Sequence, residues 1–216
     1  MTASRKTTAT VLRDLDAYLD LPRVTGLAVS RDGSRATLVV SQLDEKKTKF
    51  VSTLWEADPA GERQARRIAF SERGESAPVF AADGSLLFLS SRGSGEGGED
   101  PPPSVWRLPA EGGEASEVAK FPGAAGGLLA AETAAAVVAT VATLSGATSA
   151  EEDEKLRKLR KDGKVSAILH TGYPVRFWDH DLGPEAPRLW LVGEGAPADL
   201  TPAPAGSQVK GRQYTR

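Results

Sequence analysis

The sequence contains no cysteine among its 216 residues. A chain without cysteine can form no disulfide framework, no thiolate metal site and no cysteine nucleophile. A fold that does not depend on disulfides is compatible with a reducing compartment, so we expect a cytoplasmic protein.

The sequence also has no large excess of basic or acidic residues, and it has no long hydrophobic run. Its 27 basic and 29 acidic residues give a formal net charge of −2, so neither nucleic acid nor an anionic membrane is an expected partner. The most apolar window, residues 128–144, contains Glu132 and is shorter than the roughly 20 residues that span a bilayer. Residues 1–10 contain no apolar core of a signal peptide. We therefore expect neither secretion nor a membrane segment.

What the sequence does contain is a series of short β-type runs separated by glycine-containing turns. The turn at Asp32-Gly33 is repeated 51 residues later at Asp83-Gly84, and Trp55 and Trp106, in the strand expected after each hairpin, are also 51 residues apart. Asp-Gly flanked by β-forming residues is a strong hairpin signal, because glycine tolerates the positive φ of a tight turn. A fourth short run closes each unit, at 67–70 and at 117–119.

Four strands in a period near 50 residues are what a β-propeller blade requires. A third, weaker unit has lost its turn signal at 131–133, and its alanine-rich second run is also compatible with a helix. The β-branched valines and threonines of that run favour a strand. A β-sandwich with evenly spaced hairpins is the alternative to the propeller. The strands expected in the third unit cover residues 126–129, 134–144, 187–192 and 199–202.

A charged segment, residues 151–163, interrupts this third unit. Glu151 and Lys155, and Glu154 and Lys158, form i,i+4 pairs with the acid N-terminal to the base, and Gly163 is a natural stop. We expect an exposed helix. Because acids and bases alternate in blocks, its charges indicate a solvated face rather than a nucleic-acid site.

These patterns predict an all-β fold: a partial β-propeller of about three four-stranded blades, with a short N-terminal helix and one charged helical insertion. The N-terminal helix is amphipathic and should pack against the segment that comes after it. The polar tail shows no sign of a fourth blade. We expect a leader at 1–22, whose helix covers 10–21, a propeller at 23–202 and a tail at 203–216. Within the propeller, the expected blades are 24–71, 76–121 and 125–202.

Two segments resemble a known family. One is Leu21-Pro22-Arg23-Val24, before the first turn, and the other is residues 164–184, with Tyr173-Pro174 and Phe177-Trp178-Asp179-His180. Both are similar to the N-terminal β-propeller of prolyl oligopeptidase family serine peptidases, of the acylaminoacyl peptidase and dipeptidyl aminopeptidase-like type. The similarity extends over roughly residues 14–202. It implies a propeller that caps an α/β-hydrolase domain and limits peptide access to its catalytic serine.

The hydrolase domain lies C-terminal to the propeller in that family and is expected to be absent from this chain. A Gly-x-Ser-x-Gly elbow does not occur, and Ser94 in Gly93-Ser94-Gly95 has the wrong spacing. Without the elbow no serine has the exposed, base-paired position that nucleophilic catalysis requires. We predict no catalytic residue and no activity from this chain alone, although the family it resembles consists of serine peptidases.

Other residues that could suggest a site have simpler interpretations. In a strand, alternate side chains point to opposite faces, so Asp179 and Asp181 would point away from His180, and His170 lies ten residues earlier. We expect a hydrogen-bonded loop whose Phe177 and Trp178 pack against the blade. The glycine-rich segment 93–98 lacks the Gly-Lys-Ser/Thr of a phosphate-binding loop. We predict no metal and no cofactor site. The tryptophans expected to pack between blades are Trp55, Trp106 and Trp190.

The expected function is the non-catalytic propeller portion of an acylaminoacyl peptidase-like enzyme, which gates peptide access to the hydrolase domain. The alternative is a free-standing propeller-type module that binds a protein or peptide. Expected partners are the hydrolase domain or a peptide substrate. Three blades do not easily close a ring, so open blade edges should also favour self-association.

Overall fold

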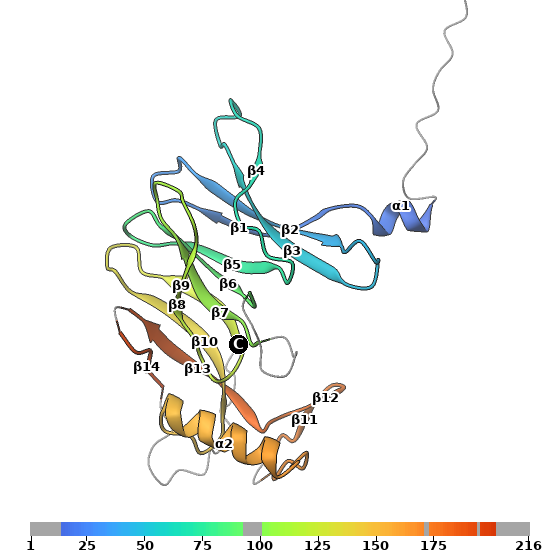
Figure 1. Ribbon diagram of the computed structural model, residues 1–216, viewed down its shortest axis with the longest axis vertical. Coiled ribbons are helices and arrows are strands. Elements are labelled where there is room, and N and C mark those ends of the chain that lie inside the picture. The colour runs from blue at the N-terminus through green and yellow to red at the C-terminus, as the bar shows by residue number, and fades with distance from the viewer. Residues whose placement is uncertain (1–13, 93–100, 171–172, 194, 202–216) are drawn as a thin grey trace, which may run out of the picture.

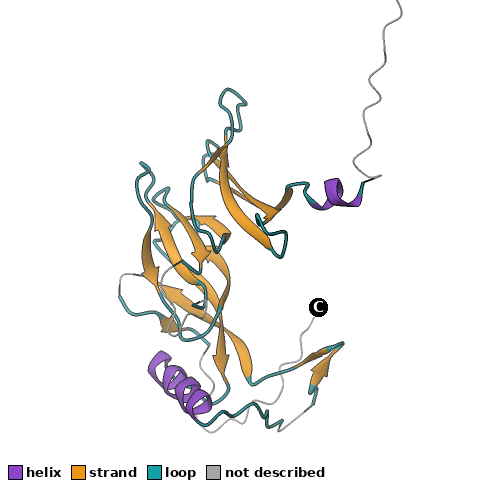
Figure 2. Cartoon of the chain, turned by 45° about the vertical axis from the view of Figure 1, so that its right-hand side comes forward, coloured by secondary structure: helices purple, strands orange, loops and turns teal. Residues whose placement is uncertain are grey.

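The computed structural model describes residues 14–92, 101–170, 173–193 and 195–201. Most strands within these ranges form three separate four-stranded antiparallel sheets, which stack in chain order (Figures 1 and 2). This arrangement confirms the predicted partial propeller of three blades, with two helices. No helix in the described ranges is long and apolar enough to cross a membrane.

Blade 1 is a meander in the order β1-β2-β3-β4. The Asp32-Gly33 turn joins its first two strands, and Gly33 has a φ of 72°, as a tight turn requires. The outermost strand is shorter than the predicted run at 67–70, because only two residues keep full pairing with β3. The strands are β1 (Arg23–Val29), β2 (Ala36–Leu43), β3 (Phe50–Ala57) and β4 (Arg66–Arg67).

Blade 2 repeats this order with the second Asp-Gly turn between its first two strands. Its strand β6 is buried along its whole length, because blades lie against both of its faces. The strands are β5 (Glu75–Phe80), β6 (Leu86–Ser90), β7 (Ser104–Leu108) and β8 (Ser116–Ala119).

Blade 3 has the order β9-β10-β13-β14. The alanine-rich run is a strand and not a helix, as its β-branched residues indicated, and it pairs along eight residues with β13. The connection that lacks the Asp-Gly signal, residues 131–136, is as long as the one at 30–35 in blade 1. The Ala131 N–H closes it by donating to Ala136 O at 2.8 Å, as the Ser30 N–H donates to Arg35 O at 2.9 Å. The strands are β9 (Ala125–Ala130), β10 (Val137–Leu144), β13 (Glu185–Val192) and β14 (Ala198–Asp199).

The N-terminal helix α1 (Leu15–Leu19) begins at Asp14, whose side chain accepts from the N–H groups of Asp16 and Ala17. It is shorter than the predicted 10–21, of which residues 10–13 lie outside the described ranges. The prediction that its apolar face is packed was wrong, since none of its residues is buried and Leu15 is 70% exposed. One turn of helix offers too little apolar surface to compete with solvent.

The insertion helix α2 (Ala150–Asp162) matches the predicted segment and begins at a Ser149 cap. One acidic side chain is not solvated as expected: Asp153 is 1% exposed and accepts from the Leu144 N–H at 2.8 Å. Arg157 pairs with Asp153 at 2.9 Å and also donates to Ala142 O at 2.8 Å. The helix is therefore fixed to the end of β10 by a buried acid and its arginine.

Blades pack face to face, with alternate residues of each strand on opposite faces. We call the face of a blade that points toward the next blade in the chain its front face, and the opposite one its back face. The front face of blade 1, with Val39 and Leu54, packs on Phe88 of the blade 2 back face. The front face of blade 2 contains Leu87, Leu89 and Val105, and it packs on the blade 3 back face, which contains Val137, Ala139, Val141, Trp190 and Val192.

The repeated tryptophans all lie on back faces. Trp190 is 2% exposed and meets Phe121 edge to face at 5.9 Å between ring centroids, and Trp106 packs against the core between blades 1 and 2. Both pack between blades as predicted. Trp55 opposes Leu38, whereas the next pair, Val39 and Leu54, faces blade 2. Trp55 therefore lies on the free back face of blade 1, where no described blade covers it.

The core between the first two blades generates a first prediction. Phe88 is fully buried there, so Phe88→Ala removes its burial and leaves a cavity, which should lower the free energy of unfolding by about 3–5 kcal/mol. Equilibrium urea denaturation measures this loss. The matched change Leu159→Ala, on a side chain of α2 that is 58% exposed, should shift stability by about 0.5 kcal/mol or less. Equal losses would contradict the packing of blades 1 and 2 on Phe88.

Candidate functional site

The blades present two different ends. The turn end carries the short hairpin turns, and side chains link these turns between blades: Arg35 donates to Gly84 O at 3.1 Å and Arg31 donates to Glu132 O at 3.1 Å. The insertion end carries the β2–β3 connection, α1, α2 and the small hairpin of the insertion (Figure 1). Lys47 in the β2–β3 connection pairs with Asp20 after α1 at 2.7 Å.

A cleft of about 340 Å³ opens at the turn end between blades 1 and 2. Side chains from both blades form it, and most of them are polar or charged. The lining residues are Ser34, Arg35, Glu56, Arg63, Arg66, Ile68, Leu108, Ala110, Glu111 and Gly112.

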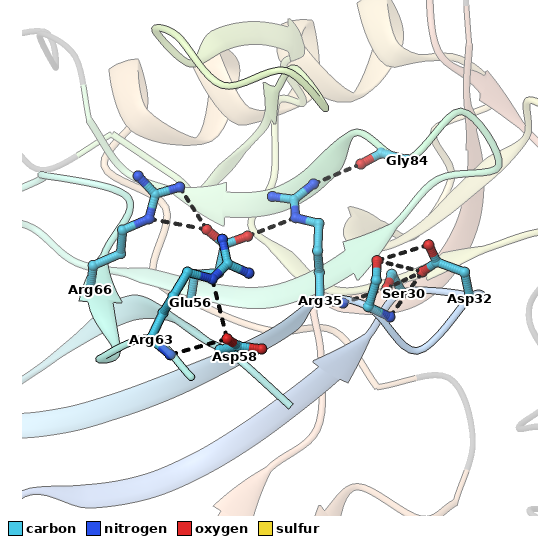
Figure 3. Close-up of polar contacts among 9 residues, drawn as sticks. Ser30, Asp32, Arg35, Glu56, Asp58, Arg63, Arg66 and Gly84 are labelled. Atoms are coloured by element: carbon cyan, nitrogen blue, oxygen red, sulfur yellow. Dashed lines mark hydrogen bonds and ion pairs between the residues drawn. The ribbon is translucent and has the colours of Figure 1, made fainter. Parts of the chain in front are cut away.

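Glu56 organises the charges of this cleft. Its carboxylate accepts from Arg35 Nε at 2.6 Å and from Arg66 Nη2 at 2.8 Å, so one acid holds two guanidinium groups (Figure 3). Burial alone would favour the protonated acid, but the hydrogen bonds from Arg35 and then Arg66 outweigh it and hold the pKa of Glu56 below its ordinary value. A third arginine, Arg63, pairs separately with Asp58 at 3.2 Å.

Most of the charged groups in the cleft are paired, as Arg35 and Arg66 are with Glu56 and Arg63 is with Asp58. Its lining includes neither histidine nor cysteine, and the hydroxyl of Ser34 bonds the carboxylate of Asp32. Arginine side chains at its rim still have N–H groups that can donate to backbone carbonyls or carboxylates. The cleft therefore offers mainly charged groups and N–H donors to whatever lies in it.

Beside the cleft, the first hairpin turn is closed by a carboxylate. Asp32 accepts from the Ser30 hydroxyl at 2.6 Å, and from the Ser34 N–H at 3.1 Å and the Ser34 hydroxyl at 2.8 Å. These bonds favour the ionised form, the one from the Ser30 hydroxyl most of all, and lower the pKa of Asp32 to about 2. The side chain is fixed to its own turn, as expected for an Asx-type hairpin.

This turn generates a second prediction. Because the Ser30 hydroxyl is the largest cause of the low pKa, Ser30→Ala should raise the pKa of Asp32 toward its ordinary value of 3.8, as measured by NMR titration of the carboxyl carbon. The depressed pKa contributes stability that is present above pH 3.8 and is lost as the pH falls through about 2. The variant should lose less stability across that window. An unchanged titration midpoint would contradict the assigned bond.

A buried acid that the sequence did not single out lies at the start of β5. Glu75 is 2% exposed, and its Oε1 accepts from the Ser71 N–H at 2.6 Å and from Arg92 Nη2 at 3.0 Å. Burial favours the protonated acid and raises the pKa of Glu75, although the two hydrogen bonds favour the ionised form and oppose this. The same Arg92 lies over the rings of Phe88 at 5.2 Å and Trp106 at 4.8 Å. The pair joins the strand entering blade 2 to its aromatic back face, so its role is structural.

At the insertion end, strands β11 (Arg176–Phe177) and β12 (His180–Asp181) form a hairpin that projects away from the three blades (Figures 1 and 2). The predicted packing of its aromatic residues on the blade was wrong: Phe177 is 65% and Trp178 87% exposed. Only two residue pairs form the ladder, so the hairpin is too short to fold back over the sheet. It presents an apolar surface to solvent instead.

The histidines lie in this same region. His180 Nδ1 lies 3.4 Å from Asp179 Oδ1, and Asp181 pairs with Arg176 at 3.3 Å. These groups are exposed, and no group of three His, Cys, Asp or Glu side chains in the described ranges could hold a metal ion. His170 is exposed in the irregular segment after α2. Ser94 and the glycine-rich segment 93–98 lie outside the described residues.

No protein-family model and no curated protein matches the sequence. Solved structures do match. The chain is similar to an acylaminoacyl peptidase from Pyrococcus horikoshii, with a TM-score of 0.58 and 10% identity, over 82% of this chain and 24% of that one. It is also similar to the AtxE2 isopeptidase, with a TM-score of 0.51 and 16% identity, over 82% of this chain and 28% of that one.

The chain thus spans about a quarter of the length of the structures that it matches. At identities of 10% and 16% the likeness shows a shared fold and no more. This protein has the β-propeller fold of the regions that it covers in the acylaminoacyl peptidase and the isopeptidase.

Proposed function

We propose that this chain is the non-catalytic propeller portion of an acylaminoacyl peptidase-like serine peptidase, and that it gates peptide access to an α/β-hydrolase domain. The observation that carries the proposal is the likeness to the Pyrococcus horikoshii acylaminoacyl peptidase over 82% of this chain, at a TM-score of 0.58. The segment similarities at 21–24 and 164–184 point to the same family.

The insertion end is where the hydrolase domain would dock. The hairpin there exposes Phe177 and Trp178, and Tyr173 just before it is 88% exposed. Large exposed aromatic side chains close together are typical of surfaces that bind another protein. The chain also enters its first blade at this end, since β1 begins directly after α1. A domain seated here would receive only peptides that pass the propeller.

The gating role relies on the rigidity of the blades. The two apolar cores join the three sheets, so a folded protein substrate could not pass between them without disrupting buried contacts. An extended peptide could not pass through these packed cores either, so its path to the hydrolase would lie beside the blades, in a gap too narrow for a folded protein. The propeller would therefore select substrates by size, while the hydrolase supplies the serine chemistry.

The second candidate is a free-standing module that binds a peptide. The observation that favours it is the cleft at the turn end, whose arginines at the rim can donate to a peptide backbone or a terminal carboxylate. Peptide binding that is lost on Arg66→Ala, without any associated hydrolase, would support this candidate over the first.

The test of the proposed function begins with the DNA downstream of the coding region. We expect it to encode a Gly-x-Ser-x-Gly elbow within an α/β-hydrolase segment, in frame or just out of it. When that segment is produced together with this chain, the two should copurify. The chain should slow hydrolysis of long peptides several-fold and leave a short acylated reporter almost unaffected.

A matched pair of variants locates the docking surface. The double change Phe177→Ser and Trp178→Ser should weaken copurification at least tenfold, whereas Arg63→Ser, a 77% exposed side chain at the opposite end, should not. Hydrolysis of the reporter by this chain alone, blocked by a serine-directed inhibitor, would overturn the proposal. So would a downstream sequence that encodes no hydrolase.

A further inference from the structure

Two apolar sheet faces in the described part of the chain are not covered by another blade. One is the back face of blade 1, and the other is the front face of blade 3. Within the chain, the same two kinds of face are packed together twice, since each front face lies on the back face of the following blade.

The free back face of blade 1 is built like the packed ones. Leu27 is paired with Leu38 and is 62% exposed, and Val24 and Val29 on the same face are 63% and 52% exposed. Trp55 on this face donates its indole N–H to the Thr53 hydroxyl at 3.0 Å. Trp106, on the packed back face of blade 2, donates in the same way to Ser104 at 3.0 Å. Blade 1 thus presents a formed docking face.

The free front face of blade 3 resembles the packed front faces equally closely. Leu129 is paired with Val138 and is 73% exposed, and Leu191 opposes Val138 from the other side. Leu189 on the same face is 41% exposed. The corresponding front positions of blade 2, Val79 and Leu87, are paired in the same way and lie in the core shared with blade 3. This face is therefore shaped to receive a back face.

We propose that the occupant of both faces is a second copy of this chain, and that two copies close a head-to-tail ring of six blades. The front face of blade 3 in each copy would pack on the back face of blade 1 in the other. A two-fold axis makes both contacts equivalent. Because two steps of 180° return to the first copy, the head-to-tail contacts form a closed ring rather than an open filament. Six blades lie within the four to eight that propellers typically have.

Apolar packing, rather than pairing of strand edges, is the driving force in this assembly. Removing these aliphatic faces from water is favourable in proportion to the apolar area buried. The proposal concerns the two outer faces and does not depend on the peptidase role. Loss of the ring would leave docking at the insertion end untouched, and absence of a hydrolase would leave the ring untouched.

Sedimentation velocity on the full chain at micromolar concentration tests the assembly. We expect a species of twice the 22.7 kDa chain mass. Leu27→Glu on the back face and Leu129→Glu on the front face should each give a monomer. Both copies carry the substitution, and each contact uses one back face and one front face, so a charge enters both contacts of the ring. Leu159→Glu, on an α2 side chain that is 58% exposed, should remain a dimer. Circular dichroism melts check that every variant is folded.

Mixing the two monomeric variants tests the head-to-tail arrangement directly. The Leu27→Glu chain keeps an intact front face and the Leu129→Glu chain an intact back face, so the mixture should form a heterodimer through one intact contact, more weakly than the wild type. A monomeric wild type, or a series of larger species, would overturn the proposal. A dimer of either variant alone would also overturn it, since that requires back-to-back or front-to-front contact.

Discussion

Each blade of this protein is a thin sheet with two apolar faces, and one sheet alone could keep neither face from water. The stacking of the front face of one blade on the back face of the next resolves this, and the other features of the fold depend on it. Phe88 and Leu54 fill the first contact, and Trp190 and Leu89 lie in the second. Blade 2, packed on both sides, is consequently the centre of the structure.

This packing leaves the two ends of the blades free for function. At the turn end Asp32 and Asp83 close the first hairpins of blades 1 and 2, and Glu56 holds two arginines beside an open cleft. At the insertion end α2 is fixed to β10 through Asp153 and Arg157, while the aromatic hairpin projects outward. The two ends therefore differ in what they expose: a cleft lined mainly by charged side chains at one, and the charged helix α2 with an aromatic hairpin at the other.

The sequence was sufficient to predict features that depend on local signals. The Asp-Gly turns and the spacing of Trp55 and Trp106 predicted the blades, and the charge pairs predicted α2. Contacts between residues distant in sequence were not predictable: the Glu75–Arg92 pair has no signature in either segment. Nor could the pattern around Phe177 reveal that its strand would pair over only two residues and leave the Phe177 side chain exposed. Local periodicity specifies which faces are apolar but not which of them become covered.

A double-mutant cycle across the second blade contact tests the packing account most directly. Phe121, which lies just after blade 2, meets Trp190 of blade 3 edge to face at 5.9 Å between ring centroids. We predict that Phe121→Leu and Trp190→Leu are coupled by about 0.5–1.5 kcal/mol in the free energy of unfolding. Phe88→Leu, in the other core, should combine with Trp190→Leu additively. Additive losses for Phe121 and Trp190 would contradict the account.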